Sequence, residues 1–278
     1  MSVVVFGRGF LGQRLAASID GAVLDAADIT DRGAVSAALS RHGATAAINA
    51  AGKTGRPNVD WCESHPVETW RANVVGALNV AEACREAGAY LLHLGSGCVF
   101  YGPSPSPGGW REDEFANPKG YYSRTKYAAD LALSPLANTA VVRLRMPIDG
   151  APSPRNLITK LAGYKSVIDV ENSVTVVDDL VDVVKGLVAR RAEGVFHATN
   201  PGTMRHRELI ALYRELVDPS HACEFIDEEA LKSRGLVTAT RSNCVLASPR
   251  LDALGLTMRP VSVALRDAME RYARAVRA

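Results

Sequence analysis

The first nineteen residues restrict the fold of this chain more than any other segment. The apolar run SVVVF (2–6) has the β-branched composition of a buried strand, and FLGQRLAASI (10–19) has helical spacing. Between them lies a G-x-G-x-x-G turn, whose glycines let the backbone turn tightly and approach a pyrophosphate at the helix N-terminus. This context predicts a dinucleotide-binding loop. We expect every residue of the loop to contact the cofactor: Gly7, Arg8, Gly9, Phe10, Leu11 and Gly12.

Short apolar runs alternate with amphipathic stretches through the first half of the chain. Strands that alternate with helices of this length predict βαβ units and a parallel sheet. We therefore expect an α/β fold: a Rossmann-type doubly wound parallel sheet with a smaller, interwoven C-terminal substrate-binding lobe. The strands expected in this half are 2–6, 22–25, 45–50, 89–95 and 139–145, and the helices are 10–19, 32–43, 67–87 and 121–133.

The pattern loosens after Arg145, where short strands and helices are interleaved with loops. We expect 1–150 to form the NAD(P)-binding Rossmann domain and 151–278 mainly the substrate lobe, with a helix and a strand near 179–200 returning to the Rossmann core. The Pro- and Gly-rich segment 101–120 is expected to be a lid or substrate loop, or else a disordered insert. The later helices are expected at 154–163, 179–190, 206–217, 227–233 and 261–276, and the strands at 167–170, 174–177 and 194–200.

Charge and cysteine content argue against several classes of protein. The 32 Lys and Arg against 30 Asp and Glu give a net charge of +2 with no long run of either sign, so we expect no nucleic-acid or membrane partner. The N-terminus lacks the basic region and cleavage site of a signal peptide, which favours a cytoplasmic protein. Neither cysteines nor histidines have metal-ligand spacing, so we assign no metal and no disulfide framework. The five cysteines are Cys62, Cys84, Cys98, Cys223 and Cys244.

The end of the second expected strand bears on the choice of cofactor. Asp25 lies where a carboxylate can accept a hydrogen bond from the ribose 2′-hydroxyl of NAD, whereas Arg8 in the glycine loop could meet the 2′-phosphate of NADP. The two residues favour opposite cofactors, and the residues alone do not decide. Asp28 and Ile29 could close over the adenine, or could form a capping turn before the next helix.

A second candidate site combines a strand end with a helix. The apolar strand 89–95 ends in Gly-Ser-Gly-Cys, at the edge where such a sheet opens onto its active-site crevice, and Ser96 could orient a substrate carbonyl. Tyr122 and Lys126 form a Y-x-x-x-K pair on one helix face. An ammonium beside the phenol would lower its pKa, ordinarily about 10, and fit it for proton transfer. Together these residues predict hydride reduction of a ketone, with Tyr122 and Lys126 also touching the cofactor.

This combination resembles the extended branch of the short-chain dehydrogenase/reductases that acts on sugar nucleotides. The segments TGRPNVDWCESH, SGC, GYYSRTKYAAD, RLRMP, PRNLITK and NPG…HRELIALYRE resemble the plant-type nucleotide-rhamnose synthases over nearly the whole chain. Those enzymes are bifunctional 3,5-epimerase/4-reductases of nucleoside diphosphate 4-keto-6-deoxy-glucose. The dTDP-4-dehydrorhamnose reductases and GDP-fucose synthases are more distantly similar. One departure is a glycine loop one residue shorter than the G-x-x-G-x-x-G of the family.

The resemblance gives roles to the remaining candidates. It implies that Cys98 is an acid–base group for epimerisation, and that Lys160 delivers a proton to the opposite face of the sugar. An enolate formed at C3 or C5 would carry its charge on the C4 oxygen, which Ser96 and Tyr122 could stabilise. Without this context, a lone cysteine at a strand end is more often a small buried apolar residue.

Further positions complete the expected site. Ala50, Ala51 and Gly52 are expected beside the nicotinamide ribose. Asn156 and Arg241 are candidate ligands of the substrate diphosphate, with a surface role equally open for the arginine. The remaining expectation is that Asn73 ties the central helix to the strand that carries Ser96.

We therefore expect a cytoplasmic, NAD(P)H-dependent epimerase/reductase that converts a UDP- or dTDP-linked 4-keto-6-deoxy-glucose to the L-rhamnose nucleotide. NADPH is the expected cofactor, with NADH tolerated because Asp25 suits a free 2′-hydroxyl. The alternatives are a 4-ketoreductase without epimerase activity and a non-catalytic Rossmann binding subunit. The sequence does not determine the nucleotide base or the oligomeric state, and a homodimer is compatible with it.

Overall fold

The computed structural model describes residues 1–56 and 58–277, which divide into two compact units. The predicted division at residue 150 differs from this result in two segments, 100–114 and 144–150, which belong to the second unit. Trp110 explains the placement of 100–114, because its backbone N–H donates to Val245 O at 2.8 Å and it forms a parallel β-bridge with Leu246. The first unit comprises residues 1–99, 115–143 and 181–196, and the second comprises 100–114, 144–180 and 197–278.

The first unit is built on a six-stranded sheet. The last residue of β5 and the last two residues of β10 are assigned to the second unit. Its order, β10-β5-β4-β3-β1-β2, reverses the direction of chain progression at β1, and β1 pairs in parallel with both β2 and β3. Such a reversal opens a crevice at the carboxyl ends of the strands. The predicted Rossmann-type fold is confirmed. The strands are β1 (Val3–Phe6), β2 (Ala22–Asp25), β3 (Ala46–Asn49), β4 (Tyr90–Ser96), β5 (Thr139–Leu144) and β10 (Gly194–Ala198).

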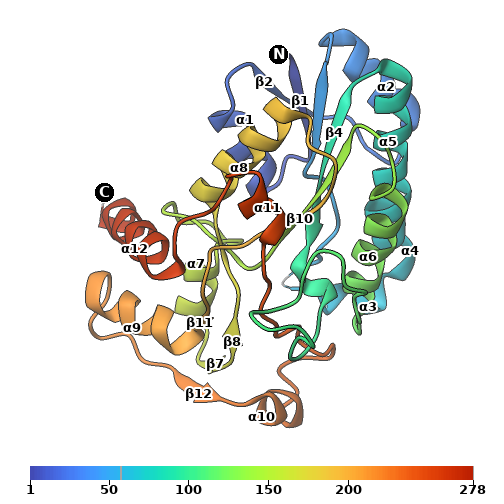
Figure 1. Ribbon diagram of the computed structural model, residues 1–278. Helices are drawn as coiled ribbons and strands as arrows, with labels where there is room; N and C mark the ends of the chain where they lie inside the picture. The colour runs from blue at the N-terminus through green and yellow to red at the C-terminus, as the bar shows by residue number, and fades with distance from the viewer. Residues whose placement is uncertain (57, 278) are drawn as a thin grey trace. The chain divides into compact units, whose positions relative to one another are not determined.

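Helices cover both faces of this sheet. Figure 1 shows α2, α5 and α6 along one face, with α1 and α8 along the other. Val4 and Phe6 of β1, Leu91 of β4 and Ala129 of α6 belong to one buried cluster that also includes residues of α2 and α5. The apolar side chains on this face of the sheet therefore pack against α2, α5 and α6. The helices are α1 (Phe10–Ser18), α2 (Arg32–Arg41), α5 (Gly76–Ala87), α6 (Tyr121–Leu133) and α8 (Val177–Arg190).

The predicted helix 67–87 is not one regular helix. It is divided into α4 (Pro66–Trp70), the π-helical segment η1 (Arg71–Val75) and α5, and a short α3 (Trp61–Ser64) precedes it. In η1 the buried Asn73 accepts from Lys53 N at 2.7 Å and donates to Lys53 O at 3.0 Å and Thr125 Oγ1 at 3.1 Å. The prediction that Asn73 ties this helix to the Ser96 strand is therefore wrong, because its partners lie after β3 and on α6.

The second unit contains short strands and helices around a core of its own. Its buried cluster includes Ile148, Ile158, Leu209 and Met269. Three two-stranded sheets, β6-β9, β7-β12 and β8-β11, join segments distant in sequence. The elements are β6 (Pro147–Ile148), α7 (Leu157–Ala162), β7 (Ser166–Ile168), β8 (Glu171–Asn172), β9 (Thr175–Val176), β11 (Met204–Arg205), α9 (His206–Leu216), β12 (Glu224–Ile226), α10 (Glu228–Ser233), α11 (Pro249–Ala253) and α12 (Val261–Arg277).

The glycine loop explains how β1 passes directly into α1. Gly7 has a φ of +100°, and a Cβ there would lie 2.4 Å from the backbone nitrogen of Ala51. A Cβ on Gly12 would lie 1.8 Å from the carbonyl oxygen of Gly7. A Cβ on Gly9, by contrast, would meet no atom within 4 Å. The first and third glycines are therefore required for packing, whereas the second leaves open space.

We predict that Gly12→Ala destabilises the protein, because the added methyl group would overlap the Gly7 carbonyl and force backbone shifts. Overpacking of this kind costs about 1–3 kcal/mol. Urea unfolding followed by circular dichroism measures the change in free energy of unfolding. Gly9→Ala is the matched control and should stay within about 1 kcal/mol of wild type, since its φ of −81° suits alanine. Equal losses in both variants would contradict the packing argument.

Candidate active site and nucleotide pocket

A cavity of about 490 Å³ lies within the first unit, at the carboxyl ends of β1, β2 and β3. Seven residues predicted to bind the cofactor line this cavity, so the fold brings together side chains that are far apart in the sequence. These seven are Gly7, Arg8, Asp25, Asp28, Ile29, Ala51 and Gly52. The other predicted positions of the two turns are absent from its lining: Gly9, Phe10, Leu11, Gly12 and Ala50.

The first turn of α1 suits a phosphate group. Gly9 occupies the N-cap position, and no side chain caps the helix there. Uncapped N–H groups at a helix N-terminus, together with the helix dipole, favour an anion. The close contacts of Gly7 and Gly12 and the open space above Gly9 complete a cradle for a pyrophosphate. The cavity and the loop therefore fit a dinucleotide.

The sequence analysis did not select the other residues that line this cavity, which include Lys53, Trp61 and Arg71. The Lys53 ammonium lies 5.6 Å from the centroid of the Trp61 ring. Hydrogen bonds from the Thr30 N–H and hydroxyl lower the pKa of Asp28, and the charges of Arg71 and Lys53 add to this effect. The position of Lys53, directly after Ala-Ala-Gly at the end of β3, is a signal that could have identified it.

Asp25 is held in a network of its own. Its Oδ1 accepts from Ala27 N at 2.8 Å, and its Oδ2 contacts Arg41 Nη2 at 2.6 Å and His42 Nε2 at 2.9 Å. Burial raises the pKa of Asp25, but these hydrogen bonds outweigh burial and lower the value to about 2. The network thus places a guanidinium at the end of β2, beside the carboxylate predicted to meet the ribose.

Ser96, Cys98 and Tyr122 form the second part of the site. Ser96 ends β4, and Cys98 lies in the 3₁₀ turn η2 (Gly97–Val99), where its N–H donates to Ser96 Oγ at 3.2 Å. Burial raises the pKa of Tyr122, the charge of Cys98 raises it further, and a hydrogen bond with Ser96 opposes both. The net shift is upward, so the predicted lowering of the phenol pKa is wrong for this structure. A raised pKa keeps the phenol protonated.

Lys126 points away from solvent and contacts β4. Its side chain is only 4% exposed, and its Nζ lies 3.0 Å from His93 Nε2 and 2.7 Å from Leu94 O. Burial lowers the pKa of Lys126 to about 8, and the charge of Asp130 opposes this shift. The sequence analysis did not select His93, because a histidine inside the run AYLLHL has the pattern of an ordinary core residue.

Glu63 fixes the start of the helix that carries Tyr122 and Lys126. Its Oε1 accepts a hydrogen bond from the Tyr121 N–H at 2.6 Å, and Tyr121 is the first residue of α6. A carboxylate at a helix N-terminus satisfies an otherwise unpaired donor and interacts favourably with the helix dipole. The segment around Trp61 that carries the family resemblance therefore contributes both to the nucleotide cavity and to the position of α6.

Three predicted residues lie in the second unit. Lys160 belongs to α7 and is partly exposed, and Arg241 is also partly exposed. Asn156 is fully buried at the N-cap of α7, accepts from Ile158 N at 3.1 Å and donates to Asp149 O and Ala151 O. Its amide is used within this turn, so the prediction that Asn156 binds the substrate diphosphate is replaced by a capping role.

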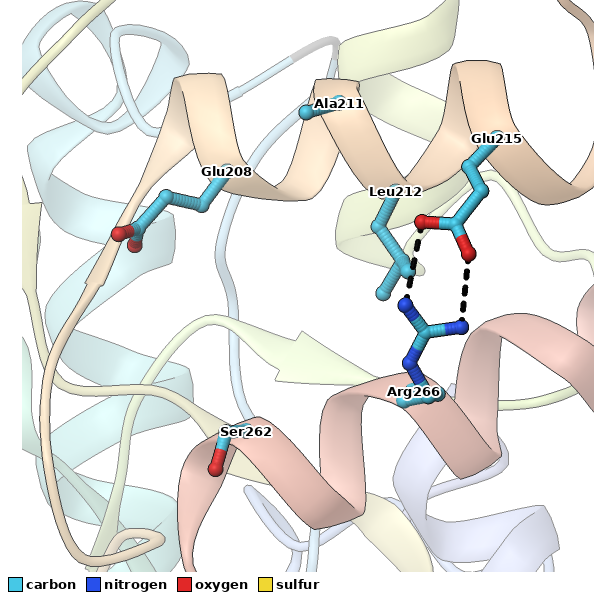
Figure 2. Close-up of a pocket in the computed structure, with 6 residues that line it drawn as sticks. All are labelled: Glu208, Ala211, Leu212, Glu215, Ser262 and Arg266. Carbon is cyan, nitrogen blue, oxygen red and sulfur yellow. Dashed lines mark hydrogen bonds and ion pairs between the residues drawn. The ribbon is translucent and has the colours of Figure 1, made fainter.

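A second cavity, of about 370 Å³, lies between α9 and α12 in the second unit (Figure 2). Arg266 donates to both carboxylate oxygens of Glu215 across it, at 2.9 and 3.1 Å. None of the predicted site residues lines this cavity. Its lining is Glu208, Ala211, Leu212, Glu215, Ser262 and Arg266.

Among residues 1–56 and 58–277, no group of three or more His, Cys, Asp or Glu side chains is arranged to hold a metal ion. None of the helices described there is both long and apolar enough to cross a bilayer.

We predict that Asp25→Asn lowers stability in a pH-dependent way. A carboxyl group whose pKa is lower in the folded than in the unfolded state stabilises the fold above its unfolded value, near 3.9, and loses this contribution as the pH falls toward about 2. Because Arg41 is exposed, we expect a loss of only about 1–2 kcal/mol at pH 7. Urea unfolding at pH 7 and pH 3 measures it.

The difference between Asp25→Asn and wild type should shrink at pH 3. Asp20→Asn removes an equal charge from an exposed side chain and should change stability little at either pH. A pH-independent loss in Asp25→Asn would show that packing, rather than the ionised network, accounts for the effect.

Comparison with known proteins identifies the family. The family model for the RmlD substrate binding domain matches residues 1–221. A bifunctional dTDP-4-dehydrorhamnose 3,5-epimerase/dTDP-4-dehydrorhamnose reductase of Arabidopsis thaliana is 42% identical over 73% of this chain and 69% of its own length. A trifunctional UDP-glucose 4,6-dehydratase/UDP-4-keto-6-deoxy-D-glucose 3,5-epimerase/UDP-4-keto-L-rhamnose-reductase of the same plant is 39% identical over 74% of this chain, which spans about a third (32%) of that relative.

Solved structures agree with this assignment. The L780 UDP-rhamnose synthase of Acanthamoeba polyphaga mimivirus superposes with a TM-score of 0.90 at 26% identity, over 98% of this chain and 99% of that one. The dTDP-4-dehydrorhamnose reductase of Bacillus anthracis, solved in complex with NADP, shares the fold with a TM-score of 0.82 at 21% identity, over 98% of each chain. The predicted family is thus confirmed: the chain belongs to the RmlD substrate binding domain family.

Proposed function

We propose that this protein is an NADPH-dependent reductase of a nucleoside diphosphate 4-keto-6-deoxy sugar, and that it also epimerises the sugar at C3 and C5. The observation that carries the proposal is the arrangement of Ser96, Cys98 and Tyr122 at the end of β4. It joins the groups needed for carbonyl reduction to a thiol that can remove a proton beside the carbonyl. The printed functions of the plant relatives and of the mimivirus enzyme support the same substrate class.

The glycine loop and the cavity of the first unit would hold the nucleotide, which supplies the hydride when bound. Arg8 lines this cavity, and Arg41 is anchored by Asp25 at the end of β2. A guanidinium group in the cavity lining and another on Asp25 suit a 2′-phosphate and therefore favour NADPH over NADH. The NADP bound by the Bacillus anthracis protein supports this choice for the present chain.

Tyr122 is the proton donor in the proposed reduction. Hydride arrives at C4 of the sugar, the C4 oxygen gains negative charge, and the Tyr122 hydroxyl transfers its proton to that oxygen. The raised pKa of Tyr122, caused mainly by burial, keeps the phenol protonated before the transfer. Ser96, which shares a hydrogen bond with Tyr122, is placed to orient the same oxygen.

Epimerisation would use the same oxygen-binding groups. The Cys98 thiolate removes the proton at C3 or C5, and the electron pair of that C–H bond moves into an enolate whose charge lies on the C4 oxygen. Ser96 and Tyr122 stabilise this charge as they do in reduction. Lys160 of α7 would return a proton to the opposite face, which inverts the centre. Arg241 is the remaining candidate ligand of the substrate diphosphate.

A plain 4-ketoreductase is the second candidate function. The set of Ser96, Tyr122 and Lys126 supports reduction with or without Cys98. A non-catalytic binding subunit is disfavoured, because a protein that only binds has no use for a phenol proton donor beside a carbonyl-orienting hydroxyl. Proton exchange at C3 and C5 separates the two enzymatic candidates.

We predict that Tyr122→Phe reduces turnover of the 4-keto sugar by at least about 100-fold, because the phenol proton takes part in the chemical step. NADPH affinity should be nearly unchanged, since the ring remains. Stopped-flow NADPH oxidation measures turnover, and fluorescence titration measures binding. Tyr121→Phe, on the same helix, is the control and should retain turnover. Near-normal oxidation by Tyr122→Phe would rule Tyr122 out as the acid.

We further predict that Cys98→Ala abolishes exchange of the C3 and C5 protons with solvent deuterium. The variant should still reduce a 4-keto-rhamnose nucleotide supplied in epimerised form, because Ser96, Tyr122 and Lys126 are intact. The exchange assay uses deuterated buffer without reducing cofactor, followed by NMR of the recovered sugar. Cys223→Ala removes a thiol in the second unit and should exchange normally.

Lys160→Ala should allow exchange without inversion if Lys160 supplies the second proton. The bifunctional proposal would be contradicted if the wild-type protein reduced the unepimerised ketone but exchanged neither the C3 nor the C5 proton. It would leave the plain reductase, in which Cys98 only fills space.

A further inference from the structure

Arg145 is a buried side chain that holds a segment without regular secondary structure in the second unit. This segment, 240–245, lies between α10 and α11 and forms no helix or strand. Arg145 Nη1 donates to Ser242 Oγ at 2.8 Å, and its Nη2 donates to Ser242 O and Asn172 Oδ1. The Ser242 hydroxyl donates in turn to Phe100 O at 2.6 Å. One guanidinium thus holds both the backbone and the side chain of Ser242.

Asn172 and Ser173, at the end of β8, hold the residues that follow. Asn172 Oδ1 accepts from the Cys244 N–H at 3.0 Å as well as from Arg145. The Ser173 N–H donates to Cys244 O at 3.1 Å, and its hydroxyl accepts from the Leu246 N–H at 2.9 Å. Contacts with other parts of the second unit, rather than a helix of its own, therefore fix the path of the segment.

The contacts of Arg145 use the fork geometry of its guanidinium. Two separate nitrogen atoms reach three acceptors, which belong to Ser242 and Asn172. A guanidinium presents five N–H donors in one rigid plane, whereas a lysine ammonium presents three donors from a single nitrogen. A lysine at this position would keep the positive charge but could not occupy both nitrogen positions at once. Arg145→Lys should therefore release Ser242 without removing the charge.

Arg241 lies directly before Ser242, and its side chain is partly exposed. On the other side of Arg241, the Tyr101 hydroxyl donates to Thr240 O at 3.4 Å. Consecutive Cα atoms lie about 3.8 Å apart, so contacts at Thr240 and Ser242 restrict where the Arg241 side chain can reach. A side chain that is already restricted loses less conformational entropy when it binds a ligand.

We propose that Arg145 is a positioning residue for the substrate diphosphate, and that it acts through Ser242 on Arg241. This inference rests on the proposed function, in which Arg241 binds the diphosphate of the nucleotide sugar. Arg145 is only 1% exposed and therefore contacts no substrate itself. Because the diphosphate is common to UDP- and dTDP-linked sugars, Arg145 serves either substrate equally.

The first test measures nucleotide binding without any chemistry. UDP and dTDP are titrated into the full-length protein by calorimetry, and the tighter of the two is used throughout. We expect Arg145→Lys to weaken its binding by about tenfold, near the upper end of what ordering one long side chain costs. NADPH affinity, measured by fluorescence titration, should not change. Arg271→Lys alters a guanidinium of the second unit that pairs with Asp178 and Asp267, and should change neither affinity.

A double-mutant cycle separates positioning from a general structural role. If Arg145 acts through Arg241, the tenfold loss caused by Arg145→Lys should fall to about twofold or less in the Arg241→Ala background, because the positioned side chain is gone. Equal losses in the two backgrounds would overturn the proposal, and so would wild-type nucleotide affinity in Arg145→Lys. Ser242→Ala is a milder second variant, should Arg145→Lys fail to fold. It removes one hydrogen bond, and we expect a loss of about threefold that also disappears in Arg241→Ala.

Hydrogen–deuterium exchange reads the position of the segment directly and does not depend on function. The Cys244 and Leu246 amides donate to Asn172 and Ser173, so their exchange reports whether these contacts persist. We expect peptides that contain 240–246 to exchange at least about fivefold faster in Arg145→Lys, and at the wild-type rate in Arg271→Lys. Unchanged exchange in Arg145→Lys would overturn the proposal.

Failure of the proposed function would give a different result. A wild-type protein that shows the expected nucleotide cycle but reduces no nucleotide-linked 4-keto sugar would contradict the proposed function and support the positioning role of Arg145. Undiminished nucleotide affinity in Arg241→Ala would instead overturn the inference, together with the proposed role of Arg241, and leave the proposed reduction by Tyr122 untouched.

Discussion

The close approach of Gly7 to Ala51 is the contact on which the rest of the first unit depends. It brings the turn after β1 against the turn after β3 with no room for a side chain on Gly7, and both residues line the nucleotide cavity. Ala51 has a second role, because its N–H orients Asn49 at the end of β3. The backbone of Ala51 therefore takes part in two interactions, the close contact with Gly7 and the hydrogen bond to Asn49.

Three buried charged side chains, Asp130, Arg143 and Lys126, interact next to the candidate catalytic groups. Burial raises the pKa of Asp130, and Arg143 and Lys126 oppose that shift. The Asp130–Arg143 pair lies between α6 and β5 with both side chains almost fully buried. Such a pair adds little net stability, yet removing one partner leaves a costly unpaired charge. The pair links α6 to β5 close to Lys126, and we interpret its role as holding the helix in place rather than adding stability.

The sequence was most informative where side-chain period and glycine stereochemistry both apply. The strand–turn–helix at the N-terminus and the strands of the sheet were predictable because each follows from local spacing. Ser96 and Tyr122 were each selected from a motif, a strand end and a Y-x-x-x-K helix, rather than from any contact between them. Two-residue strands such as β6 and β9 have no period to detect. His93 could not be distinguished from core, and Asn156 could not be recognised as a cap, because their roles depend on partners such as Lys126 and Asp149 that tertiary folding supplies.

The π-helical segment η1 has a consequence for how this region could change by insertion or deletion. A π turn holds one residue more than an α turn, so the residues before and after η1 are rotated by about 100° relative to a continuous α-helix. Deleting one residue there would restore the regular period that the sequence pattern suggests. It would also swing Arg71 off the nucleotide cavity, or Asn73 off Lys53 and Thr125, depending on which side moved. A single extra residue thus lets one helix serve two differently oriented neighbours.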